Sequence, residues 1–276
     1  MSEFHEPRVN PDGSYDTLTV EKQGALDIVT LNRPEALNAL SRQMMLELQH
    51  YFGKLYTDHT VRVVVLTGAG RGFCSGLDLK EDRSDEPAGP VNGMRTQRRV
   101  SEIMLRMHRA PQPIISLING PASGGGFGLA LASDIRIATP TVRMNAAFIR
   151  IGLSACDVGV SYFLPRLVGS ALASELLLTG NFIEAERALS SGLVSAIVEQ
   201  DQLMEAGLKM AKDIIRNSPM GVRLTKDCLN MSIDAPSLDA VIAMEDRQQI
   251  LISATGDMRE GVSAFLEKRE PDYRDD

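Results

Sequence analysis

The sequence predicts an α/β fold in which strands and helices interleave first and helices dominate later. Residues 61–67 form a short run rich in β-branched residues, and residues 113–118 form a second apolar run, as is typical of buried strands. A glycine-rich turn follows each run. From residue 160 to residue 268 the pattern is almost wholly helical, so we expect a helical C-terminal part.

The N-terminal elements are expected to be a polar lead, two strands and a helix. Residues 1–14 are polar and contain proline and glycine, which predicts a mobile lead. Residues 15–31 are typical of two strands that turn at Gln23 and Gly24. Ser41 can cap a helix, and the apolar residues that follow it with a period of 3.6 are Met45, Leu48, Phe52 and Leu55.

The middle of the chain alternates loops, helices and strands. Residues 80–93 are charged and rich in proline and glycine, which predicts a mobile loop. A helix is expected over about residues 94–109 from its apolar face. Shorter elements are predicted after residues 113–118, namely a helix at 129–132 and strands at 134–138 and 142–145.

The C-terminal part ends in a clear amphipathic helix before Pro271, with Met258, Val262, Phe265 and Leu266 in register. The whole pattern divides the chain into three parts. We expect a lead over residues 1–14, a core over 15–200 and a C-terminal helical region over 201–276.

Composition excludes several classes of protein. The chain has 276 residues and a net charge of −7, which argues against a nucleic-acid partner. The sequence has no apolar run of 18 residues and no signal peptide at its N-terminus, so we expect no membrane partner. The three cysteines lack CxxC spacing, which predicts reduced thiols and a cytoplasmic location. The four histidines lack metal-ligand spacing, so no metal site is expected.

Two glycine turns carry the chemistry that the sequence suggests. Gly76 and Leu77 follow the first buried strand, and Gly124 and Gly125 follow the second. The start of a helix leaves backbone N–H groups without carbonyl partners, and the helix dipole adds positive charge there. Such a turn can bind a phosphate or an oxyanion that forms during a reaction. If both turns reach one edge of the sheet, two N–H donors can converge on a thioester oxygen and stabilise an enolate.

Other interpretations of these turns fit the residues less well. The glycines of residues 124–128 lack the G-x-G-x-x-G spacing of a dinucleotide site, and no Gly-Lys-Ser/Thr of a P-loop follows. Residues 72–76 fit G-x-C-x-G, a cysteine version of the nucleophile elbow. That chemistry needs a histidine after the nucleophile and acid in chain order, and no histidine follows His108. Buried packing of Cys74 is therefore favoured, with a Cys74 hydrolase as the alternative.

Four stretches, at residues 30–40, 64–79, 118–126 and 260–269, resemble signatures of the crotonase (enoyl-CoA hydratase/isomerase) family, and the resemblance covers essentially residues 15–272. It implies a ββα-spiral core that binds acyl-CoA and a C-terminal helical trimerisation region. It further implies a homotrimer or a dimer of trimers. The substrate implied is an acyl-CoA thioester, so coenzyme A enters with the substrate and no separate cofactor is expected.

By this resemblance, the oxyanion donors are the N–H groups of Leu77 and Gly125. Lys268 matches a lysine near the nucleotide phosphates, and Phe265 matches an aromatic residue beside the adenine that is often reached from a neighbouring subunit. A solvated helix end and ordinary core packing are their alternative interpretations. The other residues implied to border the coenzyme A are Ala36, Leu37, Ser75, Asp78, Leu79 and Lys80. Asp78 is expected mainly to hold its loop.

The sequence departs from the family pattern at two acids. A typical hydratase has one glutamate just after the glycine turn and another about 20 residues on, which together handle water and the α-proton. Gly128 and Phe148 occupy these positions here. The nearest substitute is Asp157, in a segment that resembles the Asp-Val-Gly stretch of dienoyl-CoA isomerases; a carboxylate that caps a helix is the alternative interpretation. Further candidates are Ser154, Cys156 and Glu102.

We therefore expect an isomerase or lyase that moves a double bond or cleaves a β-oxo acyl-CoA through Asp157, in preference to simple hydration. A protein that binds CoA thioesters with little or no catalysis is the alternative.

Overall fold

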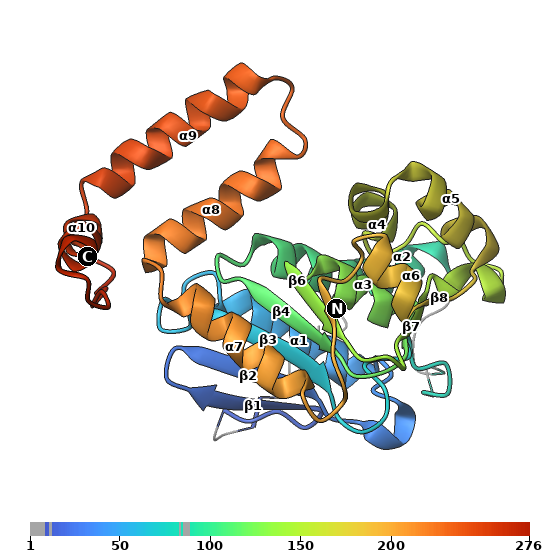
Figure 1. The fold of residues 1–276 in the computed structure, drawn as a ribbon. Helices are drawn as coiled ribbons and strands as arrows, with labels where there is room; N and C mark the ends of the chain where they lie inside the picture. The colour runs from blue at the N-terminus through green and yellow to red at the C-terminus, as the bar shows by residue number, and fades with distance from the viewer. Residues whose placement is uncertain (1–8, 11–12, 83, 85–88) are drawn as a thin grey trace.

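The computed structural model describes residues 9–10, 13–82, 84 and 89–276. Their larger sheet has the strand order β1-β2-β3-β4-β6-β9 (Figure 1). β1 is antiparallel to β2, and all the other neighbours are parallel. The strands are β1 (Leu18–Gln23), β2 (Leu26–Leu31), β3 (Val63–Gly68), β4 (Ile114–Ile118), β6 (Ile135–Ala138) and β9 (Ala196–Ile197). The predicted α/β class is confirmed.

Helices cover both faces of this sheet. Successive residues of a strand point to opposite faces, so Val64 and Leu66 join the larger hydrophobic cluster while Val63 and Val65 join the smaller one. The larger cluster contains residues of α1 (Arg42–Lys54), α2 (Pro90–Arg109) and α3 (Gly125–Ala132). The smaller cluster lies under α7 (Leu203–Ile215), which crosses the sheet in Figure 1. All eight residues of α3 are buried.

A second, smaller sheet lies beside the first and has the order β5-β7-β8. Short helices surround it on the right of Figure 1. The strands are β5 (Ala122–Ser123), β7 (Arg143–Asn145) and β8 (Ile183–Glu184). The helices are η1 (Pro34–Ala36), η2 (Ala147–Ile151), α4 (Val160–Val168), α5 (Ser170–Thr179) and α6 (Ala185–Ser190).

The last three helices leave the core as an arm (Figure 1). They are α8 (Pro219–Ser232), α9 (Leu238–Ser253) and α10 (Gly256–Glu267). None of the residues of α9 is buried. The boundary expected after residue 200 precedes α7, which packs on the sheet through Leu203 and Ala211. α8 also contacts the core, because Lys226 bonds to Met107, Gln112 and Asp134.

Several expected elements begin where the sequence predicts. Ser41 caps α1 through its side chain, which accepts a hydrogen bond from the Met44 N–H at 3.2 Å. The two strands that turn at Gln23 and Gly24 are present. Part of the expected mobile lead (1–8 and 11–12) and of the expected mobile loop (83 and 85–88) lies outside the described residues.

Two helices begin earlier than the sequence predicts. α2 begins at Pro90 and not at residue 94, because proline fits the first turn of a helix, where its missing N–H is no loss. α3 begins at Gly125 and not at residue 129. Glycine is a poor helix former in isolation, but a Cβ atom on Gly126 would collide with the Cys74 oxygen, and Cβ atoms on Gly125 and Gly128 would lie 2.8 and 2.7 Å from the side chains of Leu40 and Val158. The expected loop and helix boundaries at these two places are therefore wrong.

Candidate active site

The two glycine turns lie at one edge of the larger sheet. β3 and β4 pair in parallel, so the segments that follow Gly68 and Ile118 leave from the same, carboxyl edge. Ligands bind at this edge in open α/β sheets. The expectation that neighbouring strands deliver both turns to one place is confirmed at the level of the backbone.

Two buried asparagines fix the first turn. The Asn38 Nδ2 donates to the carbonyl oxygens of Ala69 and Gly72 at 2.9 and 2.8 Å. The Asn119 Nδ2 donates to the Gly70 carbonyl oxygen at 2.9 Å. Asn119 follows β4 directly, so the loop after one strand is tied to the end of the next. Because these amides satisfy buried carbonyls, the turn is held in one conformation.

The two turns then touch through their backbones. The Ser123 N–H donates to the Cys74 carbonyl at 3.0 Å, beside a bridge between Cys74 and Ala122. Gly76 has a φ of +93°, and a Cβ atom there would lie 2.7 Å from the Ser123 oxygen and 3.3 Å from the Gly125 nitrogen. Only glycine allows both this conformation and this approach. The Gly76 backbone therefore lies directly against the start of α3.

Both expected N–H donors are left without partners. Leu40 forms a parallel β-bridge with Leu77. The Leu40 N–H donates to the Gly76 oxygen at 2.7 Å, and the Leu40 oxygen accepts the Asp78 N–H at 3.1 Å. In such a bridge the N–H of the middle residue, Leu77, points away from Leu40. Gly125 is the first residue of α3, where N–H groups have no intrahelical partner. Neither N–H donates to any residue in the part of the chain that the structure describes.

Apolar side chains surround Gly124 and Gly128 at the start of α3. A Cβ atom on Gly128 would lie 2.7 Å from the Val158 Cγ2 and 3.0 Å from the Met104 Cε. The ring of Phe148 lies 3.5 Å from the position of a Cβ atom on Gly124. Gly124 and Gly128 are one helical turn apart, so all three apolar side chains surround the first turn of α3.

Asp157 lies on the loop before α4 and is half-buried. Its Oδ1 accepts hydrogen bonds from the Gln97 side chain and, at 2.7 Å, from the N–H of Val158. The residue that caps α4 is Gly159, without a side-chain cap, so Asp157 does not serve as the helix cap. Gln97 was missed by sequence reasoning, because 60 residues separate it from Asp157 and no motif contains it.

The residues expected to border coenzyme A come together on two adjacent loops. The Ser75 N–H donates to the Leu37 carbonyl oxygen at 3.0 Å, which places residues 36–37 beside residues 75–80. Ala36, Leu37 and Asp78 are half-buried, while Ser75, Leu79 and Lys80 are exposed.

Asp78 binds Arg33 in this region, with 2.9 Å between Oδ2 and Nη2. Burial raises the pKa of Asp78, but hydrogen bonds from Arg33 and from the N–H groups of Lys80 and Glu81 outweigh burial and hold the pKa below its usual value. Asp78 is thus an ionised group engaged in holding its loop.

Phe265 and Lys268 are not brought to this site within one chain. Both lie at the end of α10, which is at the far end of the arm from α3 in Figure 1. Phe265 is 82% exposed, so it does not serve as a core residue of this chain. Lys268 is also exposed and ends the helix in a left-handed conformation.

The remaining candidates have other surroundings. Cys74 is fully buried, and burial raises the pKa of its thiol to about 12, which confirms the expected packing role and leaves no thiolate near neutral pH. Glu102 pairs with Arg106 at 2.9 Å, and Arg106 reaches α1 through the Gln49 carbonyl. Ser154 and Cys156 are both exposed.

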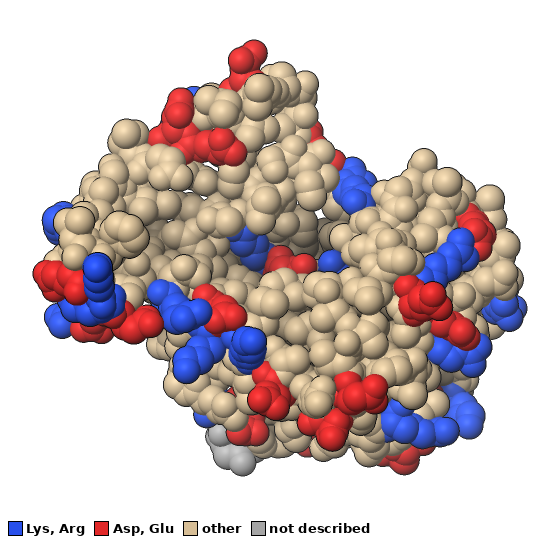
Figure 2. Space-filling model, viewed as in Figure 1, with Lys and Arg blue, Asp and Glu red and all other residues tan. Residues whose placement is uncertain are grey.

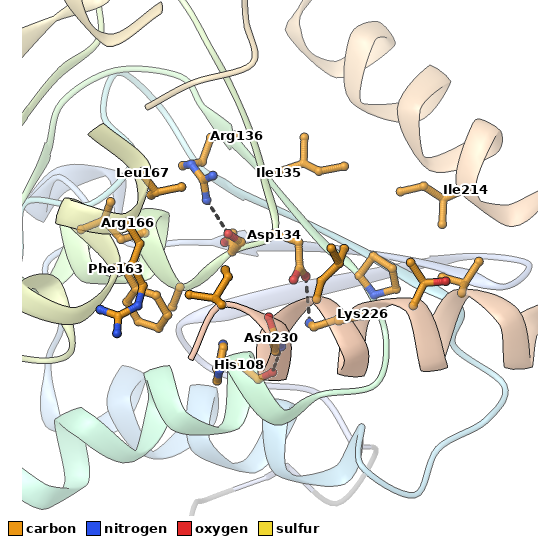
Figure 3. A pocket seen from close by; sticks show the side chains of 18 of the residues that line it. His108, Asp134, Ile135, Arg136, Phe163, Arg166, Leu167, Ile214, Lys226 and Asn230 are labelled. Atoms are coloured by element: carbon orange, nitrogen blue, oxygen red, sulfur yellow. Dashed lines mark hydrogen bonds and ion pairs between the residues drawn. The ribbon is translucent and has the colours of Figure 1, made fainter. Parts of the chain in front are cut away.

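A large cavity lies elsewhere, between the arm and the core. Figure 2 shows the hollow with charged side chains inside it. The cavity has a volume of about 780 Å³ and is lined by the last residues of α3 and the start of β6, together with α4, α7 and α8. In Figure 3 Lys226 points to Asp134, and their charged atoms are 2.8 Å apart. This is the amino edge of the parallel strands, opposite to the glycine turns.

The fold and the glycine turns at its carboxyl edge place the chain among the crotonase-type enzymes. A solved structure described as a probable enoyl-CoA hydratase/isomerase from Mycobacterium abscessus superposes with a TM-score of 0.87, at 37% identity, over 94% of this chain and 99% of that one. The family model described as enoyl-CoA hydratase/isomerase matches residues 21–276. The chain therefore belongs to the enoyl-CoA hydratase/isomerase family, whose enzymes act on acyl-CoA.

Relatives of known sequence agree with this assignment. A Mycobacterium bovis protein named probable enoyl-CoA hydratase echA12 is 40% identical over 253 residues, which cover 90% of this chain and 89% of that protein. The 1,2-epoxyphenylacetyl-CoA isomerase of Escherichia coli K12 is 38% identical over 247 residues, which cover 89% and 93%. The family includes both hydratases and isomerases, so membership alone does not select the reaction.

The described residues were also compared with what a membrane span and a metal site require. No helix among them is long and apolar enough to cross a membrane. No three His, Cys, Asp or Glu side chains among them gather as metal ligands would.

Proposed function

We propose that this protein polarises an acyl-CoA thioester between the N–H groups of Leu77 and Gly125 and stabilises the resulting enolate. Support comes from the contact between the Gly76 backbone and the Gly125 nitrogen, and from the absence of a partner for either N–H in the described part of the chain. Two aligned donors in a site with little water stabilise developing negative charge strongly. The start of α3 adds the positive end of its dipole.

The reaction that we propose is migration of a double bond, with cleavage of a β-oxo acyl-CoA as the second candidate. The observation that carries this choice is that Gly128 and Phe148, the positions that the resemblance assigns to the two hydratase glutamates, have no carboxylate, and that Val158 and Met104 pack against Gly128. Water addition needs one group to activate water and another to handle the α-proton. A 1,3-shift needs only one carrier, which removes a proton from one carbon and returns it to another.

Asp157 is the proposed proton carrier. In the migration, its carboxylate removes a proton from Cα of a 3-enoyl-CoA, and the electron pair moves to the thioester oxygen as a dienolate. The protonated Asp157 then gives the proton to Cγ, and the 2-enoyl-CoA forms. No atom or electron is supplied from elsewhere. The 38% identical relative that is named as an isomerase supports this class of reaction.

The test is a panel of 2-enoyl-, 3-enoyl-, dienoyl- and β-oxo acyl-CoA thioesters with the wild type and with Asp157→Asn. We expect turnover of the 3-enoyl or dienoyl thioester, little hydration, and a loss of at least about 100-fold in kcat for the variant. The affinity for acyl-CoA should change little. Hydration as the main reaction, or full activity of the variant, would contradict the proposal. Binding without turnover across the panel would favour a CoA-thioester binder.

We further infer that the C-terminal arm assembles the protein as a homotrimer or a dimer of trimers. The arm exposes large apolar residues that a lone chain leaves in water, including Ile250, Phe265 and Leu266 at 72–82% exposure. In such an assembly Phe265 and Lys268 would contact the adenine and phosphates of coenzyme A in a neighbouring subunit. Sedimentation compares the oligomeric state of the wild type with that of Phe265→Ser, and enzyme kinetics compares their KM for acyl-CoA. An unchanged oligomeric state together with an unchanged KM would count against this inference.

The proposed chemistry requires no cofactor beyond the coenzyme A of the substrate, because two N–H groups and one carboxylate complete the proton shift. Full activity after dialysis against a chelator is the expected result. A cytoplasmic location is proposed from the three cysteines, all of which are free thiols.

A further inference from the structure

Gln97 and Asp157 form a contact that joins two distant parts of the chain. The side-chain amide of Gln97, on α2, donates to Oδ1 of Asp157 on the loop before α4. The same oxygen accepts the Val158 N–H at 2.7 Å. The other oxygen, Oδ2, accepts no hydrogen bond from any residue that the structure describes. One oxygen of this carboxylate is therefore held twice, and the other is left open.

We propose that Gln97 is a positioning residue, which fixes Asp157 through Oδ1 so that Oδ2 carries the transferred proton. This inference rests on the proposed role of Asp157 as the proton carrier. An aspartate held by one oxygen keeps a single orientation during both halves of a proton shift, so the proton returns from the atom that received it. Hydrogen bonds to an ionised carboxylate are among the strong ones in proteins, which suits this function.

The helix that carries Gln97 is also fixed against the glycine turn. Gln97 and Met104 are seven residues apart, so they lie on nearly the same face of α2, about 10 Å apart along its axis. Met104 fills the space beside Gly128. One face of α2 thus touches both α3, which carries the proposed oxyanion donor, and the loop that carries Asp157. A shift of α2 would change the distance between donor and proton carrier.

The backbone next to Asp157 needs support of this kind. Val158 has a φ of +41°, a left-handed conformation that costs a β-branched residue about 1–3 kcal/mol. Such a conformation persists only where surrounding contacts impose it. Here Val158 packs against Gly128, its N–H is bound by Asp157, and Asp157 is bound by Gln97. The contacts form one connected support for the carboxylate.

The experiment measures kcat and KM with 3-hexenoyl-CoA for the wild type, Gln97→Met, Asp157→Asn and the double variant. Methionine matches glutamine in length but has no donor, so packing is kept while the hydrogen bond is lost. We expect Gln97→Met to lower kcat about 10–100-fold, as for loss of one hydrogen bond to a charged group, with KM within about twofold. The double variant should be no slower than Asp157→Asn alone.

Matched controls separate positioning from general damage. Arg98→Gln changes the exposed neighbouring position of the same helix and should leave kcat unchanged. The melting temperature of Gln97→Met should stay within a few degrees of the wild type. A wild-type kcat for Gln97→Met would overturn the inference, and so would equal losses from Arg98→Gln. An additive double variant would also overturn it, because Gln97 would then act independently of Asp157.

Failure of the proposed function has a different signature. If Asp157→Asn retains full kcat, the proposed proton carrier is wrong, whatever the Gln97 variants do. If Asp157→Asn is inactive while Gln97→Met is normal, the proton carrier stands and only the positioning role falls.

Discussion

The two ends of α3 face very different surroundings. At its N-terminus lie four glycines, a ring of apolar side chains, and the N–H groups of Leu77 and Gly125, which donate to no residue that the structure describes. At its C-terminus lies the 780 Å³ cavity with the ion pair between Lys226 and Asp134. The ion pair in its cavity draws attention to the second end, whereas the carboxyl edge of the strands and the two N–H groups favour the first. The chemistry that we propose therefore relies on main-chain N–H groups at the first end and not on the charged side chains at the second.

The largest effect is expected where the two glycine turns touch. Gly76→Ala places a Cβ atom 2.7 Å from the Ser123 oxygen and 3.3 Å from the Gly125 nitrogen, at a φ of +93°. The turns must separate, so at least one oxyanion donor is lost, and we expect kcat/KM to fall about 10²–10³-fold. Gly93→Ala is the matched control, because a Cβ atom there meets nothing within 4 Å. Equal activity of both variants would remove the N-terminal end of α3 from the chemistry.

A substitution at the C-terminal end of α3, beside the cavity, should lower the stability of the protein and leave catalysis unchanged. Lys226 is 6% exposed and donates to Asp134 and to the carbonyl oxygens of Met107 and Gln112. Lys226→Met removes the buried donor from these three acceptors. Because Asp134 is partly exposed and still accepts the Ile114 N–H, we expect a loss of about 2–3 kcal/mol in unfolding free energy. Urea unfolding measures the loss, while kcat of the folded variant should stay within about twofold. A large drop in kcat would mean that the cavity end takes part in the reaction.

A smaller effect is expected at Gly128, the position that the resemblance assigns to the first hydratase glutamate. Gly128→Ala brings a methyl group to 2.7 Å from Val158 and 3.0 Å from Met104, so we expect a destabilisation of about 1–3 kcal/mol. Adding Val158→Ala makes room, so the double variant should be less destabilised than the sum of the two single changes. Thermal unfolding of the four proteins tests this coupling. Strict additivity would show that Val158 does not fill the space beside Gly128.

The smallest effect is expected for the thiol beside the turn. Cys74 is buried with a pKa of about 12 against an ordinary 9.0, so iodoacetamide at pH 8 should label the exposed Cys156 and leave Cys74 unreacted. Because the raised pKa belongs to the folded state, its stabilising contribution is complete below pH 9 and is lost as the pH rises towards 12. Cys74→Ala should keep kcat and remove that alkaline loss. An inactive Cys74→Ala that still folds would revive the hydrolase alternative.

The sequence was informative wherever a signal is local. The β-branched runs, the Ser41 cap and the two glycine turns each have a physical reason contained within a few residues, and all are present. The early starts of α2 and α3 were missed for different reasons. Pro90 was a readable helix-start signal that the loop composition concealed. The helical glycines depend instead on close contacts with Leu40, Cys74 and Val158, which are distant in the sequence and which no local propensity contains.

The candidate site was predictable in its backbone and less so in its side chains. The two turns at Gly76 and Gly124 follow from the order of strands and glycines, whereas Leu77 and Gly125 are indicated as donors by the resemblance to the family. The partner of Asp157 does not, because Gln97 is an ordinary residue of an amphipathic helix until tertiary packing brings the loop to it. The left-handed Val158 was equally hidden, since a β-branched residue is the last that propensity would place there.

Burial of α3 on all sides has a consequence for hydrogen exchange. A helix with no face towards solvent can release its amide protons only when the surrounding core opens, so the later N–H groups of α3 should exchange at the rate of global unfolding. The first N–H groups lack acceptors and lie beside the turn, so they should exchange far sooner. Bound ligand would slow these early amides alone, which makes the isotope pattern of one eight-residue segment a direct reporter of occupancy.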